Sequence, residues 1–208
     1  MTAKTTPHKK GEPFLLETLK LKGGKYYNVP QHMGRIERAY AELLGSKPDF
    51  ELKVILPPPP DDGFYRVRVP YPNKTGIKVE IIPYSFPKVK TLKIVYNEDL
   101  EYSFKYLDRG GLAKIKEGIK EDDFVICRKG SLTDTSVSNV VLENEEGYYT
   151  PLGFLLDGVK RNLLIESGKV KVCPIGPGDV KKYRKLYFIN AMIDLEDNIS
   201  VLTENITI

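Results

Sequence analysis

The amino-acid sequence predicts an α+β protein of two domains, and three observations support this. The 208 residues are enough for one large domain or two small ones. Strand-like runs dominate the first half, whereas strands and amphipathic helices alternate in the second. The stretch Tyr84–Lys90, with Pro87 at its centre, predicts a linker. We therefore expect a small α+β domain over residues 1–86 and a larger domain over 87–208.

The small domain begins with a polar tail over residues 1–12, followed by a predicted hairpin. Residues 14–21 favour a strand, and a turn of two glycines separates it from a second short strand. Pro30 then introduces a helix that Gly45 ends. The apolar side chains that recur at helical spacing are Met33, Ile36, Tyr40, Leu43 and Leu44. Three further strands are predicted, over residues 52–56, 64–71 and 77–84.

The larger domain is predicted to mix strands and helices, whereas the strands of the small domain should be mostly antiparallel. Its predicted strands lie at residues 91–96, 122–130, 138–151 (with a turn at Gly147), 169–175, 188–192 and 199–204. Its predicted helices lie at residues 112–119, 158–168 and 178–187.

Composition excludes several classes of protein. The net charge of +4 is spread along the chain, without an RNA-binding signature, so no nucleic-acid partner is expected. Cys127 and Cys173 lie in strand-like runs and predict buried thiols rather than a disulfide framework. With only His8 and His32, no cluster has metal-ligand spacing. Neither an apolar leader nor a membrane-spanning stretch is found, so we expect a cytoplasmic protein.

Four short motifs follow one another in a distinctive order. "QHMGR" lies on the first helix, "FKYLDR" follows the linker, "LTDTSVSN" precedes a strand, and "TPLGFLLDGVKR" leads into a helix. Over residues 14–192 this order resembles the fold-type IV pyridoxal-phosphate enzymes: branched-chain and D-amino acid aminotransferases and aminodeoxychorismate lyase. The resemblance implies a D-amino acid aminotransferase-like fold, pyridoxal phosphate as cofactor in the larger domain, and a homodimer.

Lys105 lies between two aromatic residues, where an ammonium is costly. An apolar setting disfavours the charged form and leaves a nucleophilic amine. By the resemblance, Lys105 matches the lysine that binds the cofactor as a Schiff base and then moves a proton. Taken without the motifs, the favoured interpretation of Lys105 is a lysine at a strand end that extends into solvent.

The resemblance also predicts a site for the cofactor phosphate. Arg35 matches the helix arginine of the family, whose fork can donate two charge-assisted hydrogen bonds to phosphate oxygens. The alternative for Arg35 is a solvated helix face, and His32 in the same motif is read as structural. Helix N-termini also bind anions. The remaining candidates for phosphate contact are Gly158, Val159 and Lys160 at a helix start, and Asn190 and Ala191 in a later turn.

Asp134 stands where the family has a glutamate that pairs with the pyridine nitrogen of the cofactor. Such a carboxylate keeps the ring protonated, so that it can withdraw electrons. Aspartate keeps the charge but is one methylene shorter, which puts its reach in question. Asn139 matches the asparagine of the same motif and is expected to support the site near the ring. The alternative for Asp134 is a turn or capping role.

The reaction is less well determined than the family. The order of Lys105, Leu107 and Arg109 favours aminodeoxychorismate lyase, which releases pyruvate and leaves 4-aminobenzoate. The alternative is an aminotransferase acting on branched-chain or D-amino acids, with a small-molecule substrate in either case. A third reading is a non-catalytic, shortened homologue, because Asp134 departs from the family pattern and family members usually carry further residues before residue 14.

Overall fold

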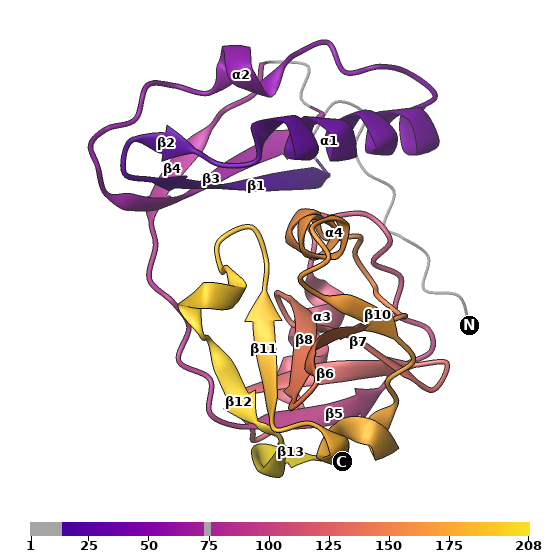
Figure 1. Ribbon diagram of the computed structural model, residues 1–208. Coiled ribbons are helices and arrows are strands. Elements are labelled where there is room, and N and C mark those ends of the chain that lie inside the picture. The colour runs from indigo at the N-terminus through magenta and orange to yellow at the C-terminus, as the bar shows by residue number, and fades with distance from the viewer. Residues whose placement is uncertain (1–13, 73–75) are drawn as a thin grey trace. The chain divides into compact units, whose positions relative to one another are not determined.

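The computed structural model describes residues 14–72 and 76–208 (Figure 1). The polar tail predicted at residues 1–12 lies outside the described residues. The chain packs as two units, one reaching to Ser85 and including Phe104–Asp108, the other comprising Phe86–Ser103 and Arg109–Ile208. The sequence-based division differs in that it places residue 86 in the first domain and residues 104–108 in the second. No helix among the described residues has the length and apolar character needed to span a membrane.

The first unit contains a four-stranded antiparallel sheet in the order β2-β1-β3-β4. Its strands are β1 (Leu15–Lys22), β2 (Lys25–Tyr26), β3 (Phe64–Tyr71) and β4 (Glu80–Pro83). The register joins Leu15 to Tyr71 and Lys22 to Phe64, so β1 pairs with β3 along its whole length. Gly23 and Gly24 form the hairpin turn with φ values of 57° and 67°, where a side chain would be strained.

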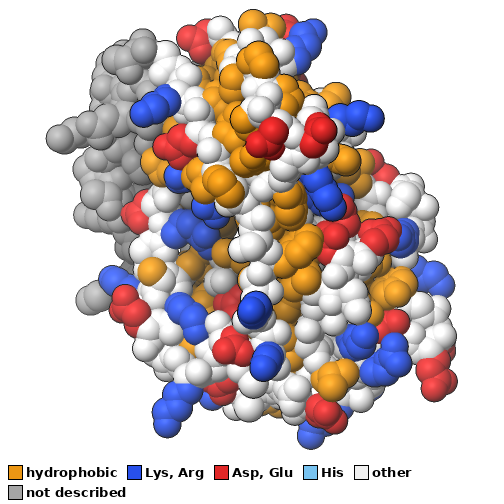
Figure 2. Space-filling view, turned by 90° about the vertical axis from the view of Figure 1, so that its left-hand side faces the viewer, with side chains coloured by type: hydrophobic (Ala, Val, Ile, Leu, Met, Phe, Trp, Pro, Cys, Tyr) orange, Lys and Arg blue, Asp and Glu red, His pale blue; other side chains and the backbone are white. Residues whose placement is uncertain are grey.

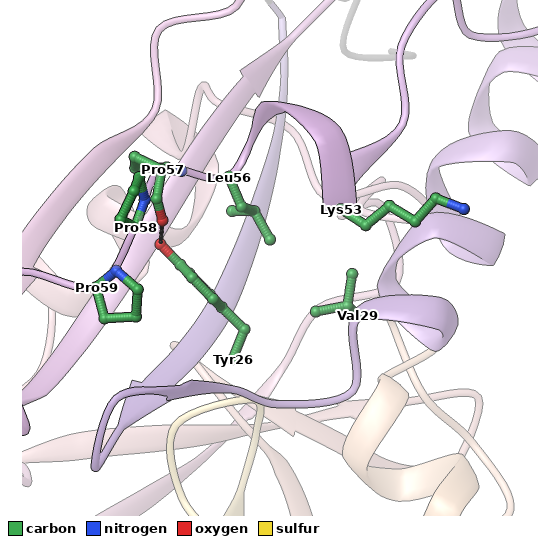
Figure 3. A pocket seen from close by; sticks show the side chains of 7 residues that line it. All are labelled: Tyr26, Val29, Lys53, Leu56, Pro57, Pro58 and Pro59. Atoms are coloured by element: carbon green, nitrogen blue, oxygen red, sulfur yellow. Dashed lines mark hydrogen bonds between the residues drawn. The ribbon is translucent and has the colours of Figure 1, made fainter.

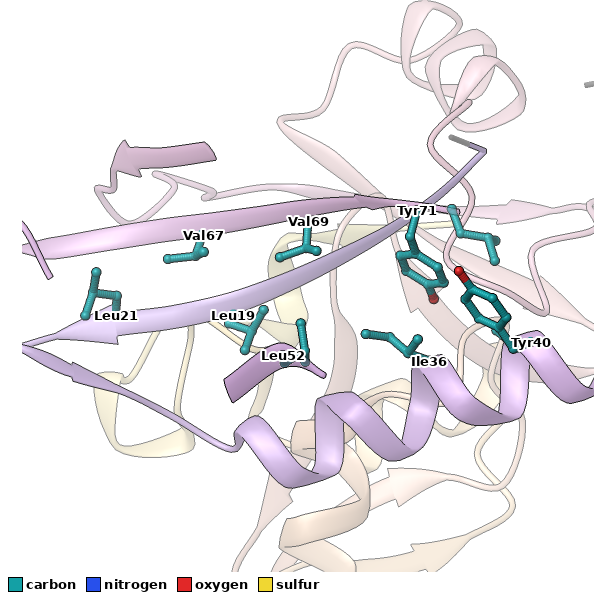
Figure 4. Packing of buried hydrophobic residues seen from close by; sticks show 10 residues of the cluster. Leu19, Leu21, Ile36, Tyr40, Leu52, Val67, Val69 and Tyr71 are labelled. Carbon is teal, nitrogen blue, oxygen red and sulfur yellow. The ribbon is translucent and has the colours of Figure 1, made fainter. Parts of the chain in front are cut away.

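Helix α1 (Val29–Leu44) packs on one face of this sheet, with Pro30 in its first turn and Gly45 at its C-cap as predicted. Figure 4 shows Ile36 and Tyr40 of α1 directed toward Leu19 and Tyr71 of the sheet. The rings of Tyr40 and Tyr71 stack with centroids 6.0 Å apart. The buried face of α1 agrees with the apolar spacing of the sequence at Ile36 and Tyr40, whereas Leu43 and Leu44 are exposed.

The strand predicted over residues 52–56 is wrong: residues Leu52–Ile55 form the short helix α2. Leu52 is fully buried, and Ile55 and Leu56 pack against the same core, so the contacts follow helical spacing. A short apolar run fits either structure, and the proline run that begins at Pro57 lacks the backbone N–H groups with which a longer strand would pair.

The second unit contains a mixed sheet, as predicted. Its strands follow the order β10-β9-β8-β7-β6-β5-β13, with β11 pairing with β8 and β12. Antiparallel pairs join β6 through β9, whereas the pairs β5/β6, β9/β10 and β5/β13 are parallel. The strands are β5 (Leu92–Tyr96), β6 (Asp123–Arg128), β7 (Ser131–Thr135), β8 (Asn139–Asn144), β9 (Gly147–Pro151), β10 (Lys171–Cys173), β11 (Lys185–Ile189), β12 (Ser200–Leu202) and β13 (Ile206–Thr207).

The helices of the second unit are α3 (Gly110–Glu117) and α4 (Val159–Glu166), with 3₁₀ turns at Pro177–Lys182, Leu195–Asp197 and Thr203–Asn205. The helix predicted over residues 178–187 is therefore wrong. Its first part is a 3₁₀ turn, and its second part is β11, whose residues from Leu186 to Ile189 are buried. Burial of successive side chains on both faces fits a central strand and not a surface helix.

Both cysteines are free thiols. Cys127 in β6 is buried, as predicted, and Cys173 in β10 is half-buried. On the face that Figure 2 shows, apolar, basic and acidic side chains are interspersed, consistent with the spread of charge along the sequence.

Candidate active site

Lys105 lies half-buried in a segment held by β1. The Tyr106 N–H donates to the Phe104 carbonyl at 2.9 Å, which closes a three-residue turn around Lys105, and the Lys105 carbonyl accepts from the Leu16 N–H at 2.9 Å. Phe104 and Tyr106 pack against the core of the first unit, with their ring centroids 6.3 Å apart. The two residues that flank Lys105 in the chain are therefore anchored in the core of the first unit, and the apolar setting of the Lys105 amine stays a prediction.

Arg35 extends from α1 to a carboxylate on β1. Its Nε–H donates to Glu17 Oε2 at 3.1 Å, and its Nη2 donates to Glu17 Oε1. Glu17 is fully buried, and His32 Nδ1 lies 2.7 Å from Glu17 Oε1. Burial alone would raise the pKa of Glu17, but the charges and hydrogen bonds of Arg35 and His32 hold this pKa well below its usual range. Arg35 is thus part of a buried ionic cluster and does not lie on a solvated helix face.

The sequence interpretation missed Glu17. A signal was present, because side chains alternate across a strand and Glu17 has the same parity as the core residues Leu15, Leu19 and Leu21. A charged residue at a core-facing position of a strand indicates a buried partner of opposite charge.

Asp134 in β7 is 7% exposed and hydrogen-bonded to groups of its own unit. Its carboxylate accepts the N–H groups of Leu155 and Leu156, each at 3.1 Å, and Nδ2 of Asn139 at 3.0 Å. Burial raises the pKa of Asp134 to about 6, although these hydrogen bonds and the charge of Arg161 act to lower it. A carboxylate has about four acceptor positions, so one remains for a further donor.

Gly158 lies directly against Asn139. A Cβ at Gly158 would come within 1.8 Å of Asn139 Oδ1, although its φ of −81° is ordinary for any residue. Glycine is therefore required by close approach and not by backbone conformation. Gly158 is the N-cap of α4, so Val159 and Lys160 form the first turn, where N–H groups lack helical partners. The Lys160 ammonium forms an ion pair with Asp194.

Asn190 organises the turn after β11. Its Oδ1 accepts the N–H groups of Met192 and Ile193 at 2.8 and 3.0 Å, and its Nδ2 donates to Ser138 Oγ at 2.9 Å. The turn that contains Ala191 is therefore tied to the residue that precedes Asn139.

The structure thus groups the predicted residues within each unit. In the first unit, β1 holds both the backbone of Lys105 and the guanidinium of Arg35. In the second unit, hydrogen bonds and close contacts connect Asp134, Asn139 and Gly158, with Asn190 beside them. Within the described ranges, no group of three or more His, Cys, Asp or Glu side chains is arranged to hold a metal ion.

A separate hollow of about 440 Å³ lies in the first unit (Figure 3). Its lining consists of Tyr26, Val29, Lys53, Leu56, Pro57, Pro58 and Pro59. The Tyr26 hydroxyl donates to the Pro57 carbonyl at 2.7 Å. None of the predicted site residues lines this hollow, so it is distinct from the candidate active site.

Comparison with known proteins supports the same class. A crystal structure from Haemophilus somnus, assigned provisionally as a 4-amino-4-deoxychorismate lyase, matches with a TM-score of 0.80 at 26% identity, over 88% of this chain and 97% of that chain. A Haemophilus influenzae protein of undescribed function is 31% identical over 185 residues, which cover 86% of this chain and 97% of the relative. No family model matches the sequence.

More distant structures share the fold. A Mesorhizobium loti structure, provisionally an amino-acid aminotransferase, matches with a TM-score of 0.70 at 19% identity, over 87% of this chain and 96% of that chain. The chain belongs to the fold-type IV family of pyridoxal-phosphate-dependent enzymes, the class that the four motifs predicted. Its two units of mixed α and β structure are those of this family.

Proposed function

We propose that the protein is a pyridoxal-phosphate-dependent lyase that converts aminodeoxychorismate to 4-aminobenzoate and pyruvate. The observation that carries this proposal is the match along nearly the whole chain to the Haemophilus somnus structure with that provisional assignment. The order of Lys105, Leu107 and Arg109 supports the same reaction.

The residues present fit the cofactor by the chemistry of their side chains. The guanidinium of Arg35 and the first turn of α4 suit a phosphate. The amine of Lys105 is a nucleophile that suits the aldehyde group of the cofactor. Asp134 has one acceptor position left for a protonated ring nitrogen, because its other positions are occupied by three donors.

The side chains of this chain then have separate tasks. Bound pyridoxal phosphate supplies an electron sink for the bond that breaks in the substrate. Lys105 Nζ would hold the cofactor and would also be the group that moves a proton. Asp134 would pair with the ring nitrogen, and the amides of Leu155 and Leu156 fix its carboxylate. In this scheme Asn139 fixes the same carboxylate from the other side.

The second candidate is an aminotransferase acting on branched-chain or D-amino acids. It is favoured by the Mesorhizobium loti structure and by a Thermotoga maritima structure provisionally assigned as a branched-chain amino acid aminotransferase, with a TM-score of 0.68. Both reactions use the same residues, with Lys105 moving the proton. A non-catalytic homologue remains the third reading, because Asp134 replaces the glutamate of the family.

Activity measurements separate these functions. Purified protein with aminodeoxychorismate should release pyruvate and 4-aminobenzoate in equal amounts, whereas an aminotransferase should instead exchange amino groups between amino acids and keto acids. Lys105→Ala should abolish either activity, and Lys114→Ala, at an exposed position of α3, should retain it. Absence of both activities, together with a failure to bind pyridoxal phosphate, would establish the non-catalytic reading.

A homodimer in the cytoplasm completes the proposal, with a small molecule as substrate and neither nucleic acid nor membrane as partner. The dimer is supported by the small size of the first unit, whose core alone is limited. Sedimentation equilibrium across micromolar concentrations should give twice the chain mass.

A further inference from the structure

Glu17 is a charged residue in an apolar layer. Leu15, Leu19 and Leu21, which share its face of β1, are all fully buried, and so is Glu17. Burying a carboxylate is costly even when it is paired, and an apolar residue at such a position is often as stable or more so. The charge at Glu17 therefore calls for a reason other than the stability of the first unit.

The contacts of Glu17 identify what it can do. Arg35 and His32 are three residues apart on α1, so both reach the same carboxylate from one helix face. The Nε and Nη2 atoms of Arg35 both donate to Glu17, which is the side-on bidentate arrangement. Two bonds between planar groups fix the plane of the guanidinium as well as its position. At most three of its five N–H bonds then remain for other acceptors.

His32 holds the carboxylate in turn. Because the carboxylate only accepts, His32 Nδ1 is the donor across the 2.7 Å contact. His32 is 1% exposed, and its Nε2 is buried without a hydrogen-bond partner. The imidazole therefore donates to Glu17 through Nδ1 while its Nε2 atom is left buried and unsatisfied. Because such an atom is costly, this arrangement indicates that the orientation of Glu17 matters.

We infer that Glu17, held by His32, is a positioning residue that fixes the plane of the Arg35 guanidinium and so sets the affinity of the protein for the phosphate of its cofactor. The inference rests on the proposed function, in which Arg35 binds that phosphate. Preorganisation of a binding group increases affinity because less ordering is left to occur on binding. Glu17 touches neither substrate nor cofactor in this account and acts through Arg35 alone.

A simple electrostatic account predicts the opposite sign. Glu17 carries a negative charge, and its removal would by itself strengthen the attraction of Arg35 for a phosphate. The positioning account predicts that removal weakens phosphate binding, because the guanidinium loses its fixed orientation. The direction of the change therefore distinguishes the two accounts.

The test compares two ligands that differ only in the phosphate: pyridoxal phosphate and pyridoxal. Full-length protein freed of cofactor is titrated with each, and both dissociation constants are measured. In Glu17→Gln, affinity for pyridoxal phosphate should fall about tenfold or more, and affinity for pyridoxal by no more than about threefold. Glu37→Gln makes the same charge change at an exposed position of α1 and should leave both constants unchanged.

Two further variants separate positioning from general damage. Glu17→Asp keeps the charge and should recover part of the preference for the phosphorylated ligand, and it provides the measurement if Glu17→Gln does not fold. Arg35→Lys removes the fork but keeps the charge. In the Arg35→Lys background, Glu17→Gln should cause no further loss of that preference, whereas a role independent of Arg35 would give additive losses.

The outcomes are distinct. If wild-type protein binds pyridoxal phosphate but Glu17→Gln binds it equally well or more tightly, the inference is overturned and the proposed function stands. Equal losses for the two ligands, or additive losses in the double variant, also overturn it. If wild-type protein does not bind pyridoxal phosphate, the proposed function fails and the inference fails with it.

Discussion

The two units each contain a buried carboxylate, and the two behave in opposite ways. Glu17 in the first unit contacts Arg35 and His32, whereas Asp134 in the second contacts only neutral donors, the amides of Leu155, Leu156 and Asn139. Burial raises both pKa values, but that of Glu17 is held well below its usual range while that of Asp134 rises to about 6.

The difference depends on how far the neighbours of each carboxylate offset the cost of its burial. Three neutral donors and the charge of Arg161 offset only part of this cost at Asp134, whereas the directly bonded Arg35 and His32 outweigh it at Glu17. Glu17 is therefore a permanent anion that suits an anchor. With a pKa of about 6, Asp134 is mostly ionised at neutral pH and takes up a proton in mild acid, and a nearby cation such as a protonated ring nitrogen would keep it ionised at lower pH.

The largest expected effect is the loss of stability when Glu17 is replaced. Glu17→Leu leaves Arg35 and His32 in the core without their acceptor and should lower the free energy of unfolding by about 3–5 kcal/mol. Replacing all three residues by apolar ones of similar volume should restore most of this loss. Urea unfolding gives the free energy of unfolding of both variants. A Glu17→Leu protein as stable as the wild type would show that the cluster contributes nothing to stability.

The next effect concerns the packing around the second carboxylate. Gly158→Ala drives a methyl group into Asn139 and should destabilise the protein by about 3 kcal/mol, because this part of the chain must shift. Gly34→Ala is the matched control on α1, where a Cβ meets nothing within 4 Å, and it should be neutral or slightly stabilising. Equal melting temperatures for the two variants would contradict the geometry at Gly158.

The two carboxylates should also give opposite pH dependences. The folded protein binds a proton at Asp134 more readily than the unfolded chain, so the contribution of Asp134 to stability is present below about pH 4 and is lost as the pH rises through about 6, at a cost of about 3 kcal/mol. Glu17 has a lowered pKa, so its contribution is present above about pH 4.5 and is lost only in stronger acid.

Unfolding measured from pH 3 to 8 tests this expectation. Asp134→Asn should remove the loss of stability between pH 4 and 6. Glu17→Gln should reduce the fall in stability that the wild-type protein shows below about pH 4.5. Saturating pyridoxal phosphate should reduce the loss between pH 4 and 6, because a ring cation keeps Asp134 ionised. A wild-type profile that Asp134→Asn leaves unchanged would assign the slope to other groups.

The smallest effect is on turnover and concerns the reach of Asp134. Asp134→Asn keeps the shape but removes the charge, and turnover should fall by about 10²-fold, or about 2.7 kcal/mol of barrier. Cofactor binding should weaken less, and Asp134→Glu should be tolerated. If Asp134→Asn with bound cofactor turns over at the wild-type rate, the role of Asp134 is only to accept the N–H groups of Leu155 and Leu156.

The sequence by itself determined the family, the hairpin and helix α1. These depend on local signals: the order of four motifs, two glycines at a turn, and apolar spacing between Pro30 and Gly45. Lys105 between two aromatic residues was likewise visible, because its neighbours in sequence are its neighbours in the fold.

Tertiary structure decided what depends on distant partners. Residues Leu52–Ile55 became helical because a core formed by other segments accepts Leu52, Ile55 and Leu56 at helical spacing. The segment from Phe104 to Asp108 joined the first unit because β1 offers it backbone partners. The opposite pKa shifts of Glu17 and Asp134 have the same origin: each side chain is buried, but only folding gives Glu17 a guanidinium as direct hydrogen-bond donor and Asp134 neutral amides.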